Sequence, residues 1–132
     1  MILGVGHDVV EIERIQRMLD GAAGERLRRR ILTPAELELP GQSARPAEFL
    51  AGRFAAKEAI SKAFGCGIGG VLGFGDMEIM PDRAGRPAVT LSAAAWDRLA
   101  LDKQGTGRCV IHLSITHERQ LASAFAVVER VE

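Results

Sequence analysis

The chain has 132 residues, of which 47% are hydrophobic, and its 17 basic side chains balance 17 acidic ones. This length fits one compact domain, residues 1–132, and the apolar content excludes a disordered chain. The zero formal net charge gives no general attraction to nucleic acid or to a membrane surface, so we expect neither as a partner.

The amino terminus and the cysteines bear on the cellular location. Acidic residues occur too early in MILGVGHDVVEIERI for a secretory signal peptide. No apolar run reaches the roughly 18 residues that a membrane helix needs. Cys66 and Cys109 match neither a zinc motif nor a disulfide framework. Together these features predict a reduced, cytoplasmic protein.

The predicted elements begin with an apolar strand over residues 2–10, which Gly4 and Gly6 interrupt. Glycines within a strand indicate the close approach of another backbone or of a ligand. Apolar residues at helical spacing then predict a helix over 11–19, and a second short helix follows at 24–32.

The middle of the chain is predicted to be helical. The segment 33–36, Thr-Pro-Ala-Glu, is a capping pattern that starts a third helix, and Pro40 is expected to end it. Residues 41–46 are predicted as a loop. The clearest helix covers 47–64, because it is rich in Ala, Leu, Glu and Lys, with one Gly and no Pro. It runs into the glycine-dense segment 65–70.

The last part of the chain is predicted to contain mostly strands. Short apolar runs predict four of them, at 77–80, 88–91, 110–115 and 122–128. A turn at 82–87 separates the first two, and the last two suggest an antiparallel pair. Between these pairs, Ser92 caps a helix that runs to about residue 101, followed by a turn at 103–107. Because strands and helices do not alternate, we expect an α+β fold with an antiparallel sheet packed against the long helix.

Two carboxylates are candidate metal ligands. Asp8 lies in an otherwise apolar strand, where it either caps the next helix or binds a metal, since a buried carboxylate is costly without a partner. Glu58 precedes Lys62 by one helical turn, and the two form either an exposed ion pair worth about 0.3–0.5 kcal/mol or part of a site. Two carboxylates with a diphosphate suit Mg²⁺.

The end of the long helix is a candidate phosphate site. Ser61 and Lys62 are predicted to share a face with Gly65. Amides freed by glycines bind phosphate, but the carboxyl end of a helix disfavours anions, so Lys and Arg side chains must supply most of the positive charge. His117 is either a turn residue or a phosphate donor. A zinc site that pairs it with His112 lacks further ligands.

Three segments together resemble the holo-acyl-carrier-protein synthases, the small bacterial type of phosphopantetheinyl transferase. They are GVGHDVVEI at 4–12, FLAGRFAAKEAISKAFGCGIG at 49–69 and LSITHERQLASAFAVVE at 113–129. The resemblance covers nearly the whole chain, and the middle segment is the most specific. Cys66 stands where the family commonly has Thr, and Thr116 where Ser is frequent.

The resemblance implies transfer of 4′-phosphopantetheine from coenzyme A to a serine of apo-acyl carrier protein, with release of adenosine 3′,5′-bisphosphate and with Mg²⁺ as cofactor. It also implies a homotrimer with its sites at the subunit interfaces. By motif, Asp8 and Glu58 match the magnesium ligands, and Lys62 matches the lysine that contacts the diphosphate; these three are the expected catalytic residues. Glu58 or a magnesium-bound water would accept the serine proton. The coenzyme A contacts implied are Arg45, Arg53, Ser61, Lys62, Gly65, Arg83, Pro87 and His117.

Docking of the acidic carrier protein is expected on the first helices. The four arginines within 26–30 form either a solvated helix face or a docking patch for an acidic partner. Under the resemblance, Arg14 and Met18 match the docking face and Arg28 extends it. Which carrier is preferred, and whether acylated coenzyme A is accepted, stay open.

Two other functions fit parts of the sequence. A non-catalytic coenzyme A-binding module would use the lysine and the glycines but would not need both carboxylates. A structural interaction domain would use only the basic helices. Magnesium-dependent product formation excludes the first alternative, and thermal stabilisation by coenzyme A counts against the second.

Overall fold

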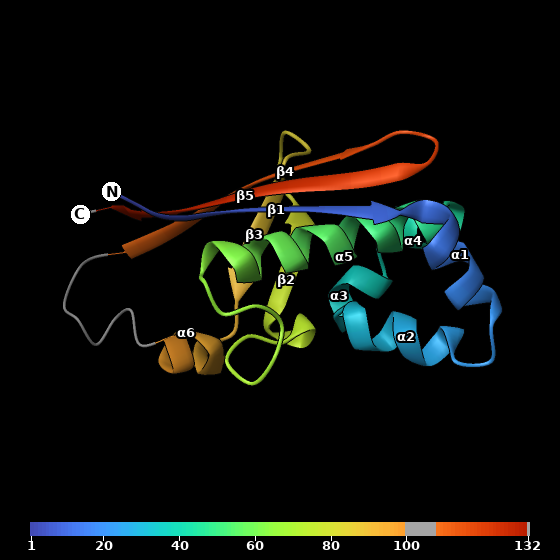
Figure 1. The fold of residues 1–132 in the computed structure, drawn as a ribbon, viewed down its shortest axis with the longest axis horizontal. Helices are drawn as coiled ribbons and strands as arrows, with labels where there is room; N and C mark the ends of the chain where they lie inside the picture. Colours follow the sequence, from blue (N-terminus) through green and yellow to red (C-terminus); the bar gives the residue numbers. More distant parts are fainter. Residues whose placement is uncertain (100–107, 132) are drawn as a thin grey trace.

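A three-stranded antiparallel sheet and a long helix dominate the fold (Figure 1). The computed structural model describes residues 1–99 and 108–131. In the sheet, β5 lies between β1 and β4, while β2 and β3 pair separately. The strands are β1 (Ile2–Glu11), β2 (Met77–Pro81), β3 (Pro87–Leu91), β4 (Arg108–His117) and β5 (Leu121–Val131). The predicted α+β class and the antiparallel pairing of the last two strands are confirmed.

The described helices lie on one side of this sheet (Figure 1). They are α1 (Ile12–Asp20), α2 (Gly24–Ile31), α3 (Pro34–Leu37), α4 (Pro40–Ala44), α5 (Pro46–Ala63), the short 3₁₀ helix η1 (Phe74–Asp76) and α6 (Ala93–Leu99). None of these helices is long and apolar enough to cross a membrane. The predicted turn at 103–107, and the predicted extension of the last helix beyond 99, lie outside the described residues.

One predicted loop is wrong. Residues 41–46 were expected to be irregular, but α4 occupies Pro40–Ala44 and α5 begins at Pro46. Pro40 was expected to end a helix, whereas it starts one. The physical reason is that a proline in the first helical turn lacks only an N–H that would have no partner there.

The capping pattern of α3 is confirmed. The backbone N–H of Glu36 donates to Thr33 Oγ1 at 3.3 Å, and the backbone N–H of Thr33 donates to Glu36 Oε1 at 2.8 Å. This reciprocal pair satisfies two N–H groups at the start of the helix. It also fixes the Glu36 side chain inside the protein, where its exposed fraction is 0%.

Helix α5 packs directly on β1, and two glycines make this possible. A Cβ atom at Gly4 would lie 1.8 Å from the carbonyl oxygen of Ala63, and one at Gly6 would lie 1.8 Å from that of Ala59. The predicted close approach of another backbone is therefore confirmed. Because side chains alternate along a strand, Asp8 points to the same face of β1 as these glycines and thus toward α5.

Candidate active site

Strand β1 and helix α5 bring Asp8 and Lys62 together. Lys62 Nζ lies 3.0 Å from Asp8 Oδ1 and donates a second hydrogen bond to the carbonyl oxygen of His7 at 3.1 Å. The Lys62 side chain is 50% exposed, whereas that of Asp8 is 17% exposed. The contact therefore lies at the protein surface, where a ligand from solvent can reach the lysine.

Glu58 is the third member of this cluster. Burial raises the pKa of Glu58 above its ordinary value, the Asp8 carboxylate acts in the same direction, and Lys62 opposes both. The two carboxylates are therefore close enough to repel each other, and one lysine does not balance their charge. Asp8, Glu58 and Lys62 are called the carboxylate group below.

The chemistry of the carboxylate group fits a magnesium ion. Mg²⁺ prefers oxygen ligands and is commonly bound by one or two carboxylates, with substrate phosphates and water completing its coordination. No cluster of three or more His, Cys, Asp or Glu side chains that could hold a metal occurs among residues 1–99 and 108–131. Asp8 and Glu58 match the one or two carboxylates that such a site commonly uses.

The end of α5 differs in part from its predicted role. Ser61 was expected to face the ligand, but its side chain is fully buried and its hydroxyl donates to the carbonyl oxygen of Glu58 at 2.7 Å. Gly65 has a φ of +79° and ends the helix in the left-handed conformation. The amides of Cys66 and Gly67 both donate to the carbonyl oxygen of Ser61. Because these amides close the helix, positive charge for a phosphate has to come from side chains.

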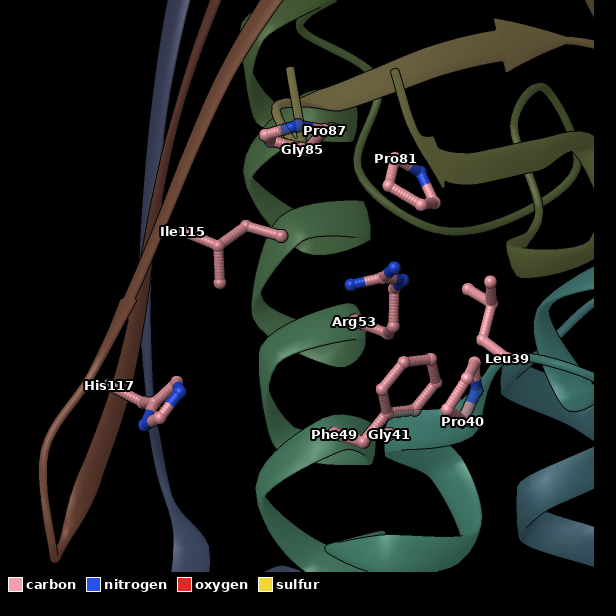
Figure 2. A pocket seen from close by; sticks show the side chains of 10 residues that line it. All are labelled: Leu39, Pro40, Gly41, Phe49, Arg53, Pro81, Gly85, Pro87, Ile115 and His117. Carbon is pink, nitrogen blue, oxygen red and sulfur yellow. The ribbon is translucent and has the colours of Figure 1, made fainter. Parts of the chain in front are cut away.

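A pocket of about 380 Å³ holds several other predicted residues (Figure 2). Arg53 lies near its centre, with the guanidinium carbon 4.5 Å from the centroid of the Phe49 ring. His117, at the end of β4, is exposed and lines the same pocket. The pocket is lined by Leu39, Pro40, Gly41, Phe49, Arg53, Pro81, Gly85, Pro87, Ile115 and His117.

Sequence reasoning identified the polar lining of this pocket but missed most of its apolar walls. Phe49 precedes Arg53 by one helical turn, and this spacing is a signal that could have identified it. Ile115 precedes His117 by two residues on a strand and so shares its face. Pro40 and the other residues before α5 carried no such signal, because α4 was not predicted.

The remaining predicted contacts lie near the pocket. Arg45 borders an adjoining groove, and its guanidinium lies 3.6 Å from the Glu48 carboxylate. Arg83 is exposed in the turn between β2 and β3. Arg45, Arg53, Pro87 and His117 are called the pocket group below.

The carboxylate group and the pocket group lie on different sides of α5. A helix turns by about 100° per residue, so Glu58 lies about 140° around the axis from Arg53, and Lys62 about 180°. The first group faces β1, and Arg53 faces β2, whose Ile79 carbonyl oxygen accepts a hydrogen bond from its Nη2 at 3.2 Å. Within one chain, the residues that the family resemblance assigns to coenzyme A thus lie on two different sides of α5.

The predicted docking residues lie on α1 and α2. Arg14 and Met18 are exposed on α1. Arg28 is partly buried, and its guanidinium lies 3.2 Å from the Glu25 carboxylate. Arg14 therefore has a more accessible charge than Arg28.

Comparison with known proteins identifies the family. The model of the 4′-phosphopantetheinyl transferase superfamily matches residues 4–124. The chain belongs to this superfamily. A holo-[acyl-carrier-protein] synthase of Vibrio cholerae is 47% identical over 130 residues, which cover 98% of this chain and 99% of that protein. The family assignment made from the sequence is confirmed.

Solved structures agree with this assignment. The holo-[acyl-carrier-protein] synthase of Neisseria meningitidis is 39% identical, with a TM-score of 0.85 over 98% of this chain and 100% of that one. The Bacillus anthracis synthase, in complex with CoA (3′,5′-ADP), is 38% identical, with a TM-score of 0.78 over 99% of each chain. The solved structures with this fold therefore include one in complex with CoA (3′,5′-ADP).

Proposed function

We propose that this chain transfers 4′-phosphopantetheine from coenzyme A to a serine of apo-acyl carrier protein and requires Mg²⁺. The observation that carries the proposal is the carboxylate group: two carboxylates from β1 and α5 beside a half-exposed lysine. Family membership favours an enzyme over a structural interaction domain, and the second carboxylate favours it over a simple binding module.

The proposed reaction breaks one phosphorus–oxygen bond and forms another. The carrier serine oxygen attacks the phosphorus that bears the pantetheine arm, the bond to adenosine 3′,5′-bisphosphate breaks, and the serine proton leaves to a base. A magnesium ion held by Asp8 and Glu58 would neutralise charge on the diphosphate. Lys62 is half exposed and can turn from Asp8 toward a phosphate oxygen, where its charge favours departure of the nucleotide.

Coenzyme A is proposed to lie between two copies of the chain. The carboxylate group and Arg53 lie on different sides of α5, so a ligand that touches both is best accommodated if one chain supplies the carboxylates and its neighbour supplies the pocket. This argument supports the association that the family resemblance implies.

The outer face of the sheet supports the same association. It carries Val5 and Phe125, which are 56% and 51% exposed, together with Val9 and Leu121. Exposed apolar patches of this kind mark interaction sites. We propose that further copies of the chain cover this face, as a homotrimer.

The carrier protein is proposed to dock on α1. This helix starts at Ile12, directly after β1, and Asp8 lies near the same end of that strand. A carrier held by Arg14 and Met18 would therefore present its serine close to the carboxylate group. An acidic carrier would be attracted by the charge of Arg14.

A mass measurement tests the proposed transfer. The protein is incubated with coenzyme A, Mg²⁺ and an apo-acyl carrier protein, and the carrier is weighed by mass spectrometry. We expect the carrier to gain one phosphopantetheine group, and to gain none when the metal is chelated. A carrier whose mass stays unchanged under all conditions would contradict the proposal.

A further inference from the structure

The side of α5 that faces α3 and β2 contains a fully buried ionic cluster. Glu36 is 0% exposed, and its Oε1 accepts hydrogen bonds from Lys57 Nζ at 2.7 Å and from the Thr33 amide at 2.8 Å. Its Oε2 accepts from the Ile79 amide at 3.1 Å and lies 3.4 Å from Arg53 Nε. One carboxylate thus lies between two cations of the same helix.

The two cations are satisfied to different extents. Lys57 uses all three donors, because its Nζ also donates to the carbonyl oxygens of Ile31 at 2.6 Å and Phe74 at 3.2 Å. Arg53 Nε makes no hydrogen bond, and its 3.4 Å contact with Glu36 is an electrostatic pair. Burial lowers the pKa of both Lys57 and Arg53, and Glu36 opposes that shift in each. Glu36 therefore helps both side chains to stay charged inside the protein.

The same contacts fix the direction of the Arg53 side chain. Glu36 lies beside Nε, the Ile79 carbonyl oxygen accepts from Nη2 at 3.2 Å, and the Phe49 ring lies against the guanidinium. The other end of the guanidinium lies among the pocket residues (Figure 2). If the Glu36 carboxylate were removed, Nε of Arg53 would lose its charged neighbour. The guanidinium would then be free to turn toward another anion and would lose this orientation.

We propose that Glu36, which lies outside the three motifs that carry the family resemblance, is a positioning residue for coenzyme A. It holds the Arg53 guanidinium at the wall of the pocket, charged and oriented toward a phosphate of the bound cosubstrate. This inference rests on the proposed function, because it takes coenzyme A as the ligand of the pocket.

The Glu36→Gln variant tests the proposal, since the amide keeps the shape of the side chain and removes its charge. We expect the KM for coenzyme A to rise about tenfold, with kcat and the KM for the carrier changing less than about twofold, because the lost interaction is one of binding. Circular dichroism and thermal melting establish that the variant is folded. If it is not folded, Glu36→Asp is measured in the same way. This variant keeps the carboxylate but shortens the side chain by one methylene, which moves the negative charge away from Arg53.

Lys57→Met is the matched control. It removes the other cation of the cluster, and therefore destabilises the fold, but it leaves the contact between Glu36 and Arg53 in place. We expect its KM for coenzyme A to stay within about twofold of the wild type. An equal rise of this KM in the Lys57 and Glu36 variants would mean that Glu36 has only a structural role, and would overturn the proposal.

A double-mutant cycle provides a readout that a purely structural role would not produce. In an Arg53→Ala background, Glu36→Gln should raise the KM for coenzyme A no further, because residues that act through one another are not additive. Additive effects on the KM for coenzyme A, or an unchanged KM in a folded Glu36 variant, would overturn the inference about Glu36 but not the proposed function. A wild-type protein that does not bind coenzyme A contradicts the proposed function as well.

Discussion

Lys57 and Lys62 lie on the same helix, five residues apart, in surroundings that differ in almost every respect. Lys57 is 0% exposed and has three acceptors, among them the buried carboxylate of Glu36. Lys62 is 50% exposed and contacts Asp8 and one carbonyl oxygen. The first lysine is fully used in holding α5 to its neighbours, whereas the second can exchange its partner for a ligand. Exposure and partners, and not residue type, distinguish the structural lysine, Lys57, from the one proposed to be catalytic, Lys62.

The largest expected effect is on the Lys62 side of α5. Glu58→Gln should reduce phosphopantetheine transfer at least about 100-fold, because it removes one of two carboxylates proposed to hold the metal and a candidate proton acceptor. The thermal melting temperature should hardly change, since Glu58 is only partly buried. Incorporation of labelled pantetheine into the carrier measures the activity, and wild-type turnover would remove Glu58 from the site.

Replacing Lys57 and Lys62 in turn with methionine tests directly whether the two lysines have different roles. Lys57→Met should cost about 3–5 kcal/mol of unfolding free energy, because it leaves the Glu36 carboxylate buried with less positive charge. Lys62→Met should cost less than about 1 kcal/mol, as for an exposed ion pair, while it lowers transfer activity. Urea denaturation of both variants measures the two costs, and similar values would show that the two lysines are not distinct.

Mixing two impaired variants tests whether opposite sides of α5 serve one site. Glu58→Gln should support little transfer at any coenzyme A concentration, and Arg53→Ala should support little at coenzyme A concentrations well below its raised KM. When the two are dissociated and reassembled together, up to about one quarter of the interfaces should combine an intact carboxylate group with an intact pocket, if the assembly is cyclic. Recovery of activity would support a shared site. Its absence in mixed oligomers, demonstrated by native mass spectrometry, would place the whole site within one chain.

The smallest effect on activity is expected at α1, the helix on which the carrier protein is proposed to dock. Arg14→Glu should raise the KM for the carrier several-fold, about 1 kcal/mol, and leave the KM for coenzyme A unchanged, because an exposed charge steers the partner without touching the cosubstrate. Arg28→Glu, where the native arginine is already paired with Glu25, is the control and should have the weaker effect. Equal changes in both KM values would defeat the docking proposal.

The sequence predicts local features of this protein well. The capping pattern at Thr33, the long helix α5 and the close approach at Gly4 and Gly6 all follow from short-range rules, and the structure contains each of them. The family motifs also single out Asp8, Glu58 and Lys62 as candidate site residues, and the fold brings these three side chains together. These are properties that a few neighbouring residues decide.

The features that the sequence could not predict depend on distant segments. The burial of Lys57 results from α3 and η1, which supply Glu36 and the Phe74 carbonyl oxygen from either side of α5 in the chain. The burial of the Ser61 side chain was not foreseen for a related reason, since the helical spacing alone did not show which side of α5 the rest of the protein covers. The helical rotation of about 100° per residue already predicts that Arg53 and Glu58 lie on different sides of α5. Which neighbouring strand each side faces could be seen only from the positions of β1 and β2 in the structure.

The two glycines of β1 carry no functional group, yet they set the gap across which Asp8 and Glu58 would share a cation. A methyl group at Gly6 would lie 1.8 Å from a carbonyl oxygen, so strand and helix would have to part by more than an ångström to accept it. Magnesium tolerates little variation around its bond length of about 2.1 Å. If Asp8 and Glu58 bind a metal as proposed, the close contact of β1 with α5 at these glycines would therefore fix the distance between the two carboxylates.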